Sequence, residues 1–226
     1  MKSKLNNIFV RFDQKEAVAY HTFVQSLIES SSIPLSITPL SENNLNIYHE
    51  KHTDGTNKFT YSRFLVPFLM NFNGWAIYFD GDMICVNDIK KLMDHIDVNV
   101  AVKVVKHNYK TKQSKKYFGQ KNENYPRKNW SSVILWNCSH PKNKILTPEF
   151  IERNNGAFLH RFKWLKDNEI GDLDKKWNWL AIEYEDINVP NLIHCTLGAP
   201  CFKEYKNTVF SNYLMNAFER LKQGFN

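Results

Sequence analysis

A short apolar run that ends in two carboxylates constrains this chain more than any other feature. The run covers residues 75–79, and Asp80, Gly81 and Asp82 follow it directly. Alternate residues of a strand point to the same side, so both carboxylates can face one ligand. Two like charges this close favour a hard divalent cation between them. The sequence therefore predicts a metal site at the end of a buried strand, with a surface Asp-Gly turn as the simpler alternative.

Length and composition indicate a single globular domain. The chain has 226 residues, of which 42% are hydrophobic and 14% aromatic, enough for one well-formed core. We therefore expect residues 1–226 to form one catalytic domain. The net charge of +7 favours an anionic partner, such as a nucleotide, an anionic lipid surface or nucleic acid. A solvated basic surface explains that charge equally well.

The cysteines and the apolar stretches bear on the compartment. None of the four cysteines forms a Cys-x-x-Cys pair, which indicates free thiols in a reducing environment. The segment 1–7 contains no apolar signal core, and no stretch approaches the roughly 20 apolar residues of a membrane span. We expect a cytoplasmic protein.

Apolar periodicity predicts an α/β fold. Strands are expected at 8–12, 35–40, 75–79, 100–105, 132–136 and 191–194. Helices are expected behind a capping box of Asp13 and Glu16, at 61–72 with a kink at Pro67, and at 88–96, 147–164 and 211–223. Segment 107–128 is basic and polar, which is typical of a long solvated loop; its aromatic residues, Tyr125 among them, leave open that it closes over an acceptor. Alternating strands and helices predict a mixed, mostly parallel sheet flanked by helices.

Polar residues follow several of these predicted strands. Functional loops of open α/β sheets gather at the carboxyl ends of strands. Residues at or just after such ends are Asp13, Asp80, Asp82, Lys106, His107, Asn137 and His194. The chain has no Gly-rich phosphate loop. A bound nucleotide would therefore need a metal and side chains to hold its phosphates.

The motif and four further segments resemble one enzyme family. Asp80-Gly81-Asp82 resembles the DxD motif of GT-A glycosyltransferases. Residues 61–67 resemble the Tyr-x-Arg helix of the retaining enzymes related to glycosyltransferase family 8. Residues 129–137, 177–178 and 194–200 resemble that family's Asn-Ser-Gly strand, its Trp-Asn segment and its late His-x-Thr-Gly-Pro stretch. They occur in the family's order and span nearly the whole chain.

The resemblance implies a single GT-A domain that transfers a hexose from a UDP-sugar to a glycan, lipid or protein acceptor with retention of configuration. It implies Mn²⁺ or Mg²⁺ as cofactor, with Asp80, Asp82 and His194 as ligands and with Arg63 beside the two aspartates as a catalytic residue. The expected donor-binding residues are Phe9, Arg11, Asp13, Arg63, Gly81, Ser131, Gly198 and Lys203. The expected acceptor-binding residues are Lys106, His107, Asn129 and Trp177.

Two departures from the family pattern stand out. The family places a Lys before Pro-Trp to grip the diphosphate, whereas this chain has Ala199 and Pro200 there, so Lys203 is the candidate replacement. The family also carries an acidic pair with Gln or Asn between its members. Here only Asp167-Asn168-Glu169 and Asp172 stand in that region.

Two other function classes stay open. A sugar nucleotidyltransferase shares the architecture but needs a Gly-rich amino-terminal loop, which residues 8–13 lack. A non-catalytic basic module for nucleic acid or anionic membrane would explain the charge. It would not explain two carboxylates at the end of a core strand, so we expect no nucleic acid partner. The closing helix 211–223 offers a possible peripheral membrane contact, with packing on the core as the alternative.

Overall fold

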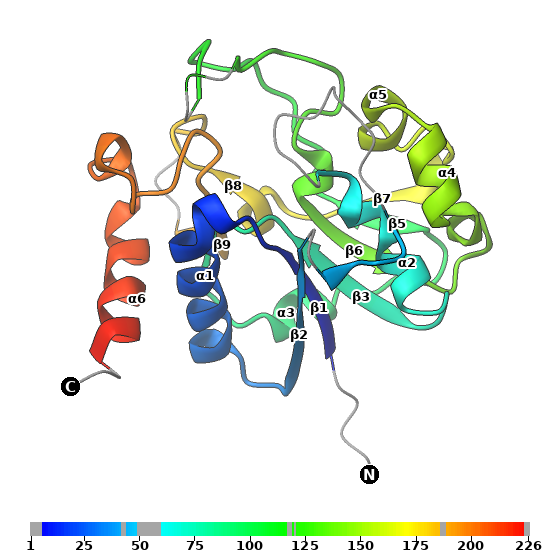
Figure 1. The fold of residues 1–226 in the computed structure, drawn as a ribbon, viewed down its shortest axis with the longest axis horizontal. Helices are drawn as coiled ribbons and strands as arrows, with labels where there is room; N and C mark the ends of the chain where they lie inside the picture. The colour runs from blue at the N-terminus through cyan, green and yellow to red at the C-terminus, as the bar shows by residue number, and fades with distance from the viewer. Residues whose placement is uncertain are drawn as a thin grey trace.

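The computed structural model describes residues 6–41, 44–48, 60–116, 119, 121–185 and 189–223 (Figure 1). A central sheet has the strand order β2-β1-β3-β6-β5-β7, and a smaller sheet has the order β4-β9-β8. The strands of the central sheet are β1 (Asn6–Arg11), β2 (Leu35–Leu40), β3 (Trp75–Phe79), β5 (Val102–Val104), β6 (Val133–Asn137) and β7 (Ile170–Asp172). Those of the smaller sheet are β4 (Met83–Cys85), β8 (Trp179–Leu180) and β9 (Leu192–His194).

The central sheet is mixed, as the sequence predicts. Strand β1 runs parallel to β2 and β3, and β5 runs parallel to β7. Strand β6 is antiparallel to both of its neighbours, β3 and β5. The helices are α1 (Ala17–Ser30), α2 (Val66–Leu69), α3 (Lys90–Met93), α4 (Pro148–Arg153), α5 (Gly156–His160) and α6 (Ser211–Gln223). The predicted α/β class and mostly parallel sheet are confirmed.

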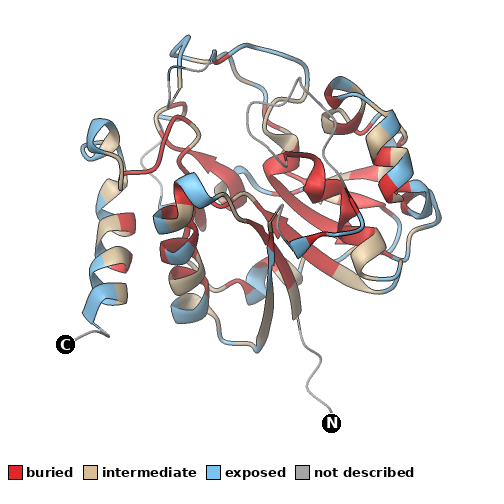
Figure 2. Cartoon of the chain, in the orientation of Figure 1, coloured by how far each residue is buried: buried red, intermediate tan, exposed pale blue. Residues whose placement is uncertain are grey.

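Both faces of the central sheet are buried, and successive residues of each strand serve opposite faces. In β3, Ile77 and Phe79 pack in a core with residues of α1, while Tyr78 packs in a core with residues of α4 and α5. Figure 1 shows α1 on one side of the sheet and α4 and α5 on the other. Strands β3, β5 and β6 are mostly buried, whereas β2, at the edge of the sheet, is largely half-exposed (Figure 2).

The closing helix α6 packs against α1. Leu214 and Ala217 are buried against that neighbour, and Arg220 makes an ion pair of 2.7 Å with Glu29 of α1. Figure 1 shows α6 beside α1, at the outer edge of the molecule. A peripheral membrane contact by this helix stays a prediction. Within the described residues, no helix combines the length and apolar character needed to cross a membrane.

Several predicted helices are shorter or divided. Segment 61–72 forms the 3-10 helix η3 (Thr60–Leu65), which continues as α2. Pro67 lies in the first turn of α2, where a missing N–H is tolerated. Segment 147–164 forms α4 and α5, because the side chain of Asn155 accepts the N–H of Phe158 and begins a second helix.

Two further expectations need correction. Asp13 does act as a cap, since its carboxylate accepts the N–H of Lys15 at 3.0 Å. Glu16 does not complete a capping box: its buried carboxylate accepts from Arg11 at 2.8 Å. Strands β4, β7 and β8 were not predicted, because each has only two or three residues and shows no period.

Candidate active site

The Asp-Gly-Asp motif connects the two sheets. Strand β3 ends just before Asp80, and β4 begins just after Asp82. The backbone N–H of Asp80 donates to the carbonyl of Ser132 at 3.0 Å. A methyl group on Gly81 would lie 2.5 Å from the carbonyl oxygen of Arg11. Glycine is therefore needed because the end of β1 passes directly against the turn.

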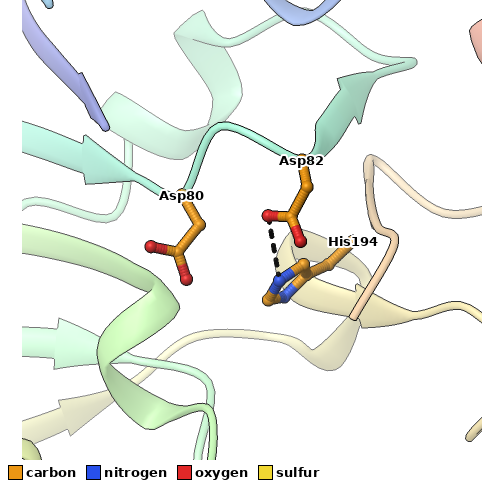
Figure 3. Close-up of side chains that lie close together, drawn as sticks. All are labelled: Asp80, Asp82 and His194. Atoms are coloured by element: carbon orange, nitrogen blue, oxygen red, sulfur yellow. Dashed lines mark ion pairs between the residues drawn. The ribbon is translucent and has the colours of Figure 1, made fainter. Parts of the chain in front are cut away.

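Strand pairing brings a histidine to this turn. His194 ends β9 and lies opposite Met83 in the antiparallel pair of β4 and β9. The N–H of Cys195 donates to the carbonyl of Asp82 at 2.9 Å, and Nε2 of His194 lies 3.4 Å from the Asp82 carboxylate. Potential ligand atoms of Asp80, Asp82 and His194 all lie within 4.8 Å of one another. Figure 3 shows the three side chains pointing toward a common space.

The tautomer of His194 is fixed by Asn178. The Asn178 amide nitrogen donates to Ser132 Oγ at 2.7 Å and to the Asn129 carbonyl at 3.2 Å. Its amide oxygen therefore faces Nδ1 of His194, at 3.0 Å, and accepts the proton there. In the neutral imidazole, the Nε2 lone pair then faces the Asp82 carboxylate. Two acceptors in this position suit a cation between them, so the two carboxylates and the imidazole form a group that could hold a metal ion.

Asp82 stays ionised although it is buried. Burial raises its pKa, but His194 in its protonated form, which would donate a hydrogen bond to the carboxylate, and the Arg11 guanidinium outweigh that effect, so in the metal-free site the pKa lies below its ordinary value. The carboxylate is only 7% exposed. A charged ligand atom is therefore kept at neutral pH with little competition from water.

Asp80 is held by an arginine whose other donors are also occupied. Arg63 pairs with Asp80 at 2.9 Å and donates to the carbonyls of Thr60 at 2.8 Å and Ser131 at 2.7 Å. Tyr78 donates to the same carboxylate at 2.7 Å. These contacts fix the orientation of Asp80. Arg63 therefore forms an ion pair with Asp80, and most of its N–H groups are already used within the protein.

A cavity of about 290 Å³ opens beside these residues. Seven residues predicted for the site line it: Arg11, Arg63, Asp80, Asp82, Asn129, Ser131 and His194. They come from the ends of β1, β3, β6 and β9 and from η3. The carboxyl ends of the parallel strands β1 and β3 meet at this edge of the central sheet, and the amino end of β6 lies beside them because β6 is antiparallel to β3.

Four predicted site residues lie in packed or ion-paired positions outside that lining. Phe9 and Trp177 are core residues, 6% and 1% exposed. Lys106 pairs with Asp172 at 3.2 Å. His107 is buried with Nδ1 at 2.5 Å from the Tyr184 hydroxyl, and burial, aided by repulsion from His194, lowers its pKa to about 3.

The other four predicted site residues cap a turn, allow close packing of the backbone or lie exposed on the surface. Asp13 is the cap of the turn after β1, and Gly81 lies against the Arg11 carbonyl. Gly198 has a φ of +151°, with the ring of Tyr205 packed against its Cα. Lys203 is exposed in a 3-10 helix (Lys203–Tyr205) and does not line the cavity.

Ten lining residues were not among those predicted for the site. They are Thr60, Tyr61, Lys116, Tyr125, Ser132, Gly156, Ala157, His160, Arg161 and Thr196. Tyr61 and Ser132 belong to segments that resemble family motifs, so their position in those segments could have marked them as site residues. His160 reaches the site through Ser131, whose hydroxyl lies 2.7 Å from Nδ1 of the imidazole. Nothing in the sequence pattern marked α5, and the basic loop that carries Lys116 and Tyr125 was marked only as a possible cover for an acceptor.

Solved structures share this architecture. The bifunctional glycosyltransferase WbbM matches 96% of the chain with a TM-score of 0.65 at 15% identity. GlyE of Streptococcus pneumoniae matches 95% with a TM-score of 0.62, also at 15% identity. The galactosyltransferase LgtC, solved with donor and acceptor sugar analogues, matches 95% with a TM-score of 0.63 at 11% identity. The chain spans half of the WbbM chain, 60% of GlyE and 95% of LgtC.

At these identities the solved structures establish the fold, which is that of GT-A glycosyltransferases. Membership of family 8 stays a prediction. No family model matches the sequence. Protein CDI of Arabidopsis thaliana is 40% identical over 221 residues, which cover 94% of this chain and 85% of that protein. On that identity and coverage, this chain belongs to the family of Protein CDI, with a GT-A glycosyltransferase fold.

Proposed function

We propose that this protein is a metal-dependent glycosyltransferase that moves a hexose from a UDP-sugar to a hydroxyl group of a glycan, glycolipid or glycoprotein. The observation that carries the proposal is the convergence of Asp80, Asp82 and His194 on one space within 4.8 Å. It lies at the strand ends of a GT-A fold, beside a cavity. Ligands of open α/β folds bind at such strand ends.

The donor set suits a hard to borderline divalent ion. Asp80 and Asp82 would supply oxygen ligands and His194 its Nε2, a combination that favours Mn²⁺ over Mg²⁺. When bound, such an ion supplies Lewis-acid stabilisation of the charge on the leaving diphosphate. Arg63 orients Asp80, and Asn178 orients His194, so the ligands are set before any ion arrives.

The transfer step needs few further groups. The bond between the anomeric carbon and the β-phosphate oxygen breaks, and that oxygen keeps the electron pair. The acceptor oxygen forms the new bond, and its proton passes to the departing phosphate oxygen. Among the described lining residues, Asp80 and Asp82 supply the carboxylates, and neither is free to act as a separate nucleophile. Retention, by a single step on one face of the sugar, is proposed from the resemblance.

The four free cysteines, of which three are buried, agree with the expectation of unpaired thiols. A cytoplasmic location stays part of the proposal.

Thermal unfolding with UDP, with and without Mn²⁺, tests the proposal. We expect stabilisation by UDP that requires Mn²⁺, since a ligand bound to the native state raises its stability. Asp82→Asn should abolish the shift, while Asp94→Asn, at an exposed carboxylate, should keep it. UDP release from a panel of UDP-sugars then identifies the sugar. If no divalent metal supports stabilisation by any nucleoside diphosphate, the proposal is wrong.

A further inference from the structure

The cavity holds four cationic side chains, and they differ in how far the protein already uses them. They are Arg11, Arg63, Lys116 and Arg161. Arg63 is committed to Asp80 and two backbone carbonyls. Arg11 is committed to Glu16 at 2.8 Å, and its Nε lies 4.0 Å from Asp80. The cations left in the lining are Arg161, which follows α5, and Lys116, whose charge interacts with those of Asp82 and Asp80.

Lys116 has a cationic group without a fixed protein partner. Among the residues that the structure describes, its ammonium makes no hydrogen bond or ion pair, and the side chain is half-buried on the cavity. Burial lowers its pKa, and Asp82, among the charges around it, acts in the opposite direction. Lys116 lines the same cavity as Asp80, Asp82 and His194.

The loop that carries Lys116 folds back on itself. Its two arms are joined by a bridge between Lys115 and Lys121 and by a hydrogen bond of 2.8 Å from the N–H of Asn122 to the Ser114 carbonyl. In a further hydrogen bond of 2.8 Å, the N–H of Thr111 donates to the Asn124 side chain. These contacts join residues 111–115 to residues 121–124, so the described parts of the loop form an arm of two paired segments, and Lys116 directly follows the first of them.

The base of that arm is attached to the rest of the site. The N–H of Lys112 donates to Glu183 at 2.9 Å, and the Asn129 side chain donates to the Tyr109 hydroxyl at 2.8 Å. Trp130 donates from its ring nitrogen to the carbonyl of His107 at 3.0 Å. Because Asn129 itself lines the cavity, the arm is positioned relative to the site.

The carboxyl-terminal segment offers no substitute. Lys203, the replacement expected from the sequence, is exposed and outside the lining. In the family that this chain resembles, the corresponding stretch carries a lysine that grips the diphosphate. Here Ala199 stands in that stretch, and it is completely buried. The carboxyl-terminal segment contributes Thr196 and His194 to the cavity but no cation.

We propose that Lys116 binds the diphosphate of the nucleotide-sugar donor and stabilises the nucleoside diphosphate as it leaves. This inference rests on the proposed function and adds a residue to it. Arg63 already neutralises the charge of Asp80. The two negative charges of the donor diphosphate and the one of Asp82 then exceed the charge of a divalent ion by one, and cleavage of the bond to the sugar adds one more negative charge. A cation placed where that charge develops contributes most in the transition state.

Calorimetric titration of UDP in the presence of Mn²⁺ tests the assignment. Lys116→Gln should weaken UDP binding by roughly 10- to 100-fold, the usual effect of one charge-assisted hydrogen bond. Lys116→Arg should keep most of the affinity, because it keeps the charge. Lys115→Gln is the matched control: that side chain is an exposed neighbour on the same arm, and its loss should leave binding unchanged.

Salt dependence separates a direct contact from a structural effect. The affinity of the wild type for UDP should fall more steeply with NaCl than that of Lys116→Gln, since the variant has one charge pair fewer. Thermal unfolding of the ligand-free variants should match that of the wild type. If Lys116→Gln binds UDP like the wild type, this inference is overturned and the proposed function stands. If the wild type binds no UDP with Mn²⁺, both are overturned.

Discussion

Asn178 accepts the Nδ1 proton of His194 across 3.0 Å, and this contact determines which imidazole nitrogen faces Asp82. The Asn178 amide is itself held by Ser132 and Asn129. The ring of His194 is therefore oriented by a group that lies behind it and does not line the cavity. Such supporting contacts typically set the affinity of a metal site.

Replacing Asn178 should weaken metal binding without removing a ligand. We expect Asn178→Ala to lower Mn²⁺ affinity by roughly 10- to 100-fold, because the imidazole loses its fixed tautomer. Titration followed by Mn²⁺ electron paramagnetic resonance measures this. Asn143→Ala is the control, since Asn143 is equally buried and donates to two carbonyls away from the cavity. Equal Mn²⁺ affinities of the two variants would contradict the role of Asn178.

Gly81 should be needed at the motif for steric reasons. We expect Gly81→Ala to cost about 1–3 kcal/mol of unfolding free energy, because the new methyl group meets the Arg11 carbonyl. It should also weaken the Mn²⁺-dependent shift with UDP, since the turn carries both carboxylates. Gly74→Ala, at the other end of β3, is a control with a φ of +71° and open space around it. That variant should lose about 1 kcal/mol and keep the UDP shift. Denaturant unfolding measures both.

Buried His107 should make the fold sensitive to mild acid. Its pKa of about 3 in the native state lies below the ordinary value of about 6.5. Between these two values the imidazole is protonated in the unfolded chain but not in the native state, so the free energy of unfolding falls as the pH drops from 6.5 toward 3. At pH 5 the loss should be about 2 kcal/mol relative to pH 7.

Denaturant unfolding of metal-free protein at pH 7 and pH 5 measures the contribution of His107. His107→Gln keeps a hydrogen-bonding group near Tyr184 but cannot titrate, so its loss between the two pH values should be smaller by about that amount. His95→Gln, at a half-buried histidine after α3, should behave like the wild type. The same pH dependence in wild type and His107→Gln would refute the assignment.

Trp177 should matter for stability rather than for acceptor binding. Its side chain is 1% exposed in the core that includes Leu173 and Leu192. We expect Trp177→Ala to lose about 3–5 kcal/mol of unfolding free energy, the usual cost of emptying such a site. Trp75→Ala, at a half-buried residue, should lose clearly less. A stable Trp177→Ala protein with weakened acceptor binding would restore the acceptor role predicted from the resemblance.

Local pattern was enough for the class of fold and for part of the site. The apolar runs gave strands β1, β3 and β6 nearly as the structure has them, because burial on both faces leaves an unbroken apolar signal. The position of Asp80 and Asp82 after such a run was visible for the same reason. The edge strand β2 is half-exposed and was found from its shorter apolar pattern. Helices of four to six residues, such as α3 and α4, were overestimated because short periodic stretches do not show where a helix ends.

What the sequence by itself determined is therefore a set of strand ends with polar residues on them. The tertiary structure decided which of those ends meet. His194 reaches Asp82 because β4 pairs with β9, and neither strand is long enough to predict its partner. Lys116 reaches the cavity because its loop folds on itself through polar contacts that have no period. Both depend on pairing between distant segments, which packing and hydrogen bonding of the whole chain select and which local spacing does not encode.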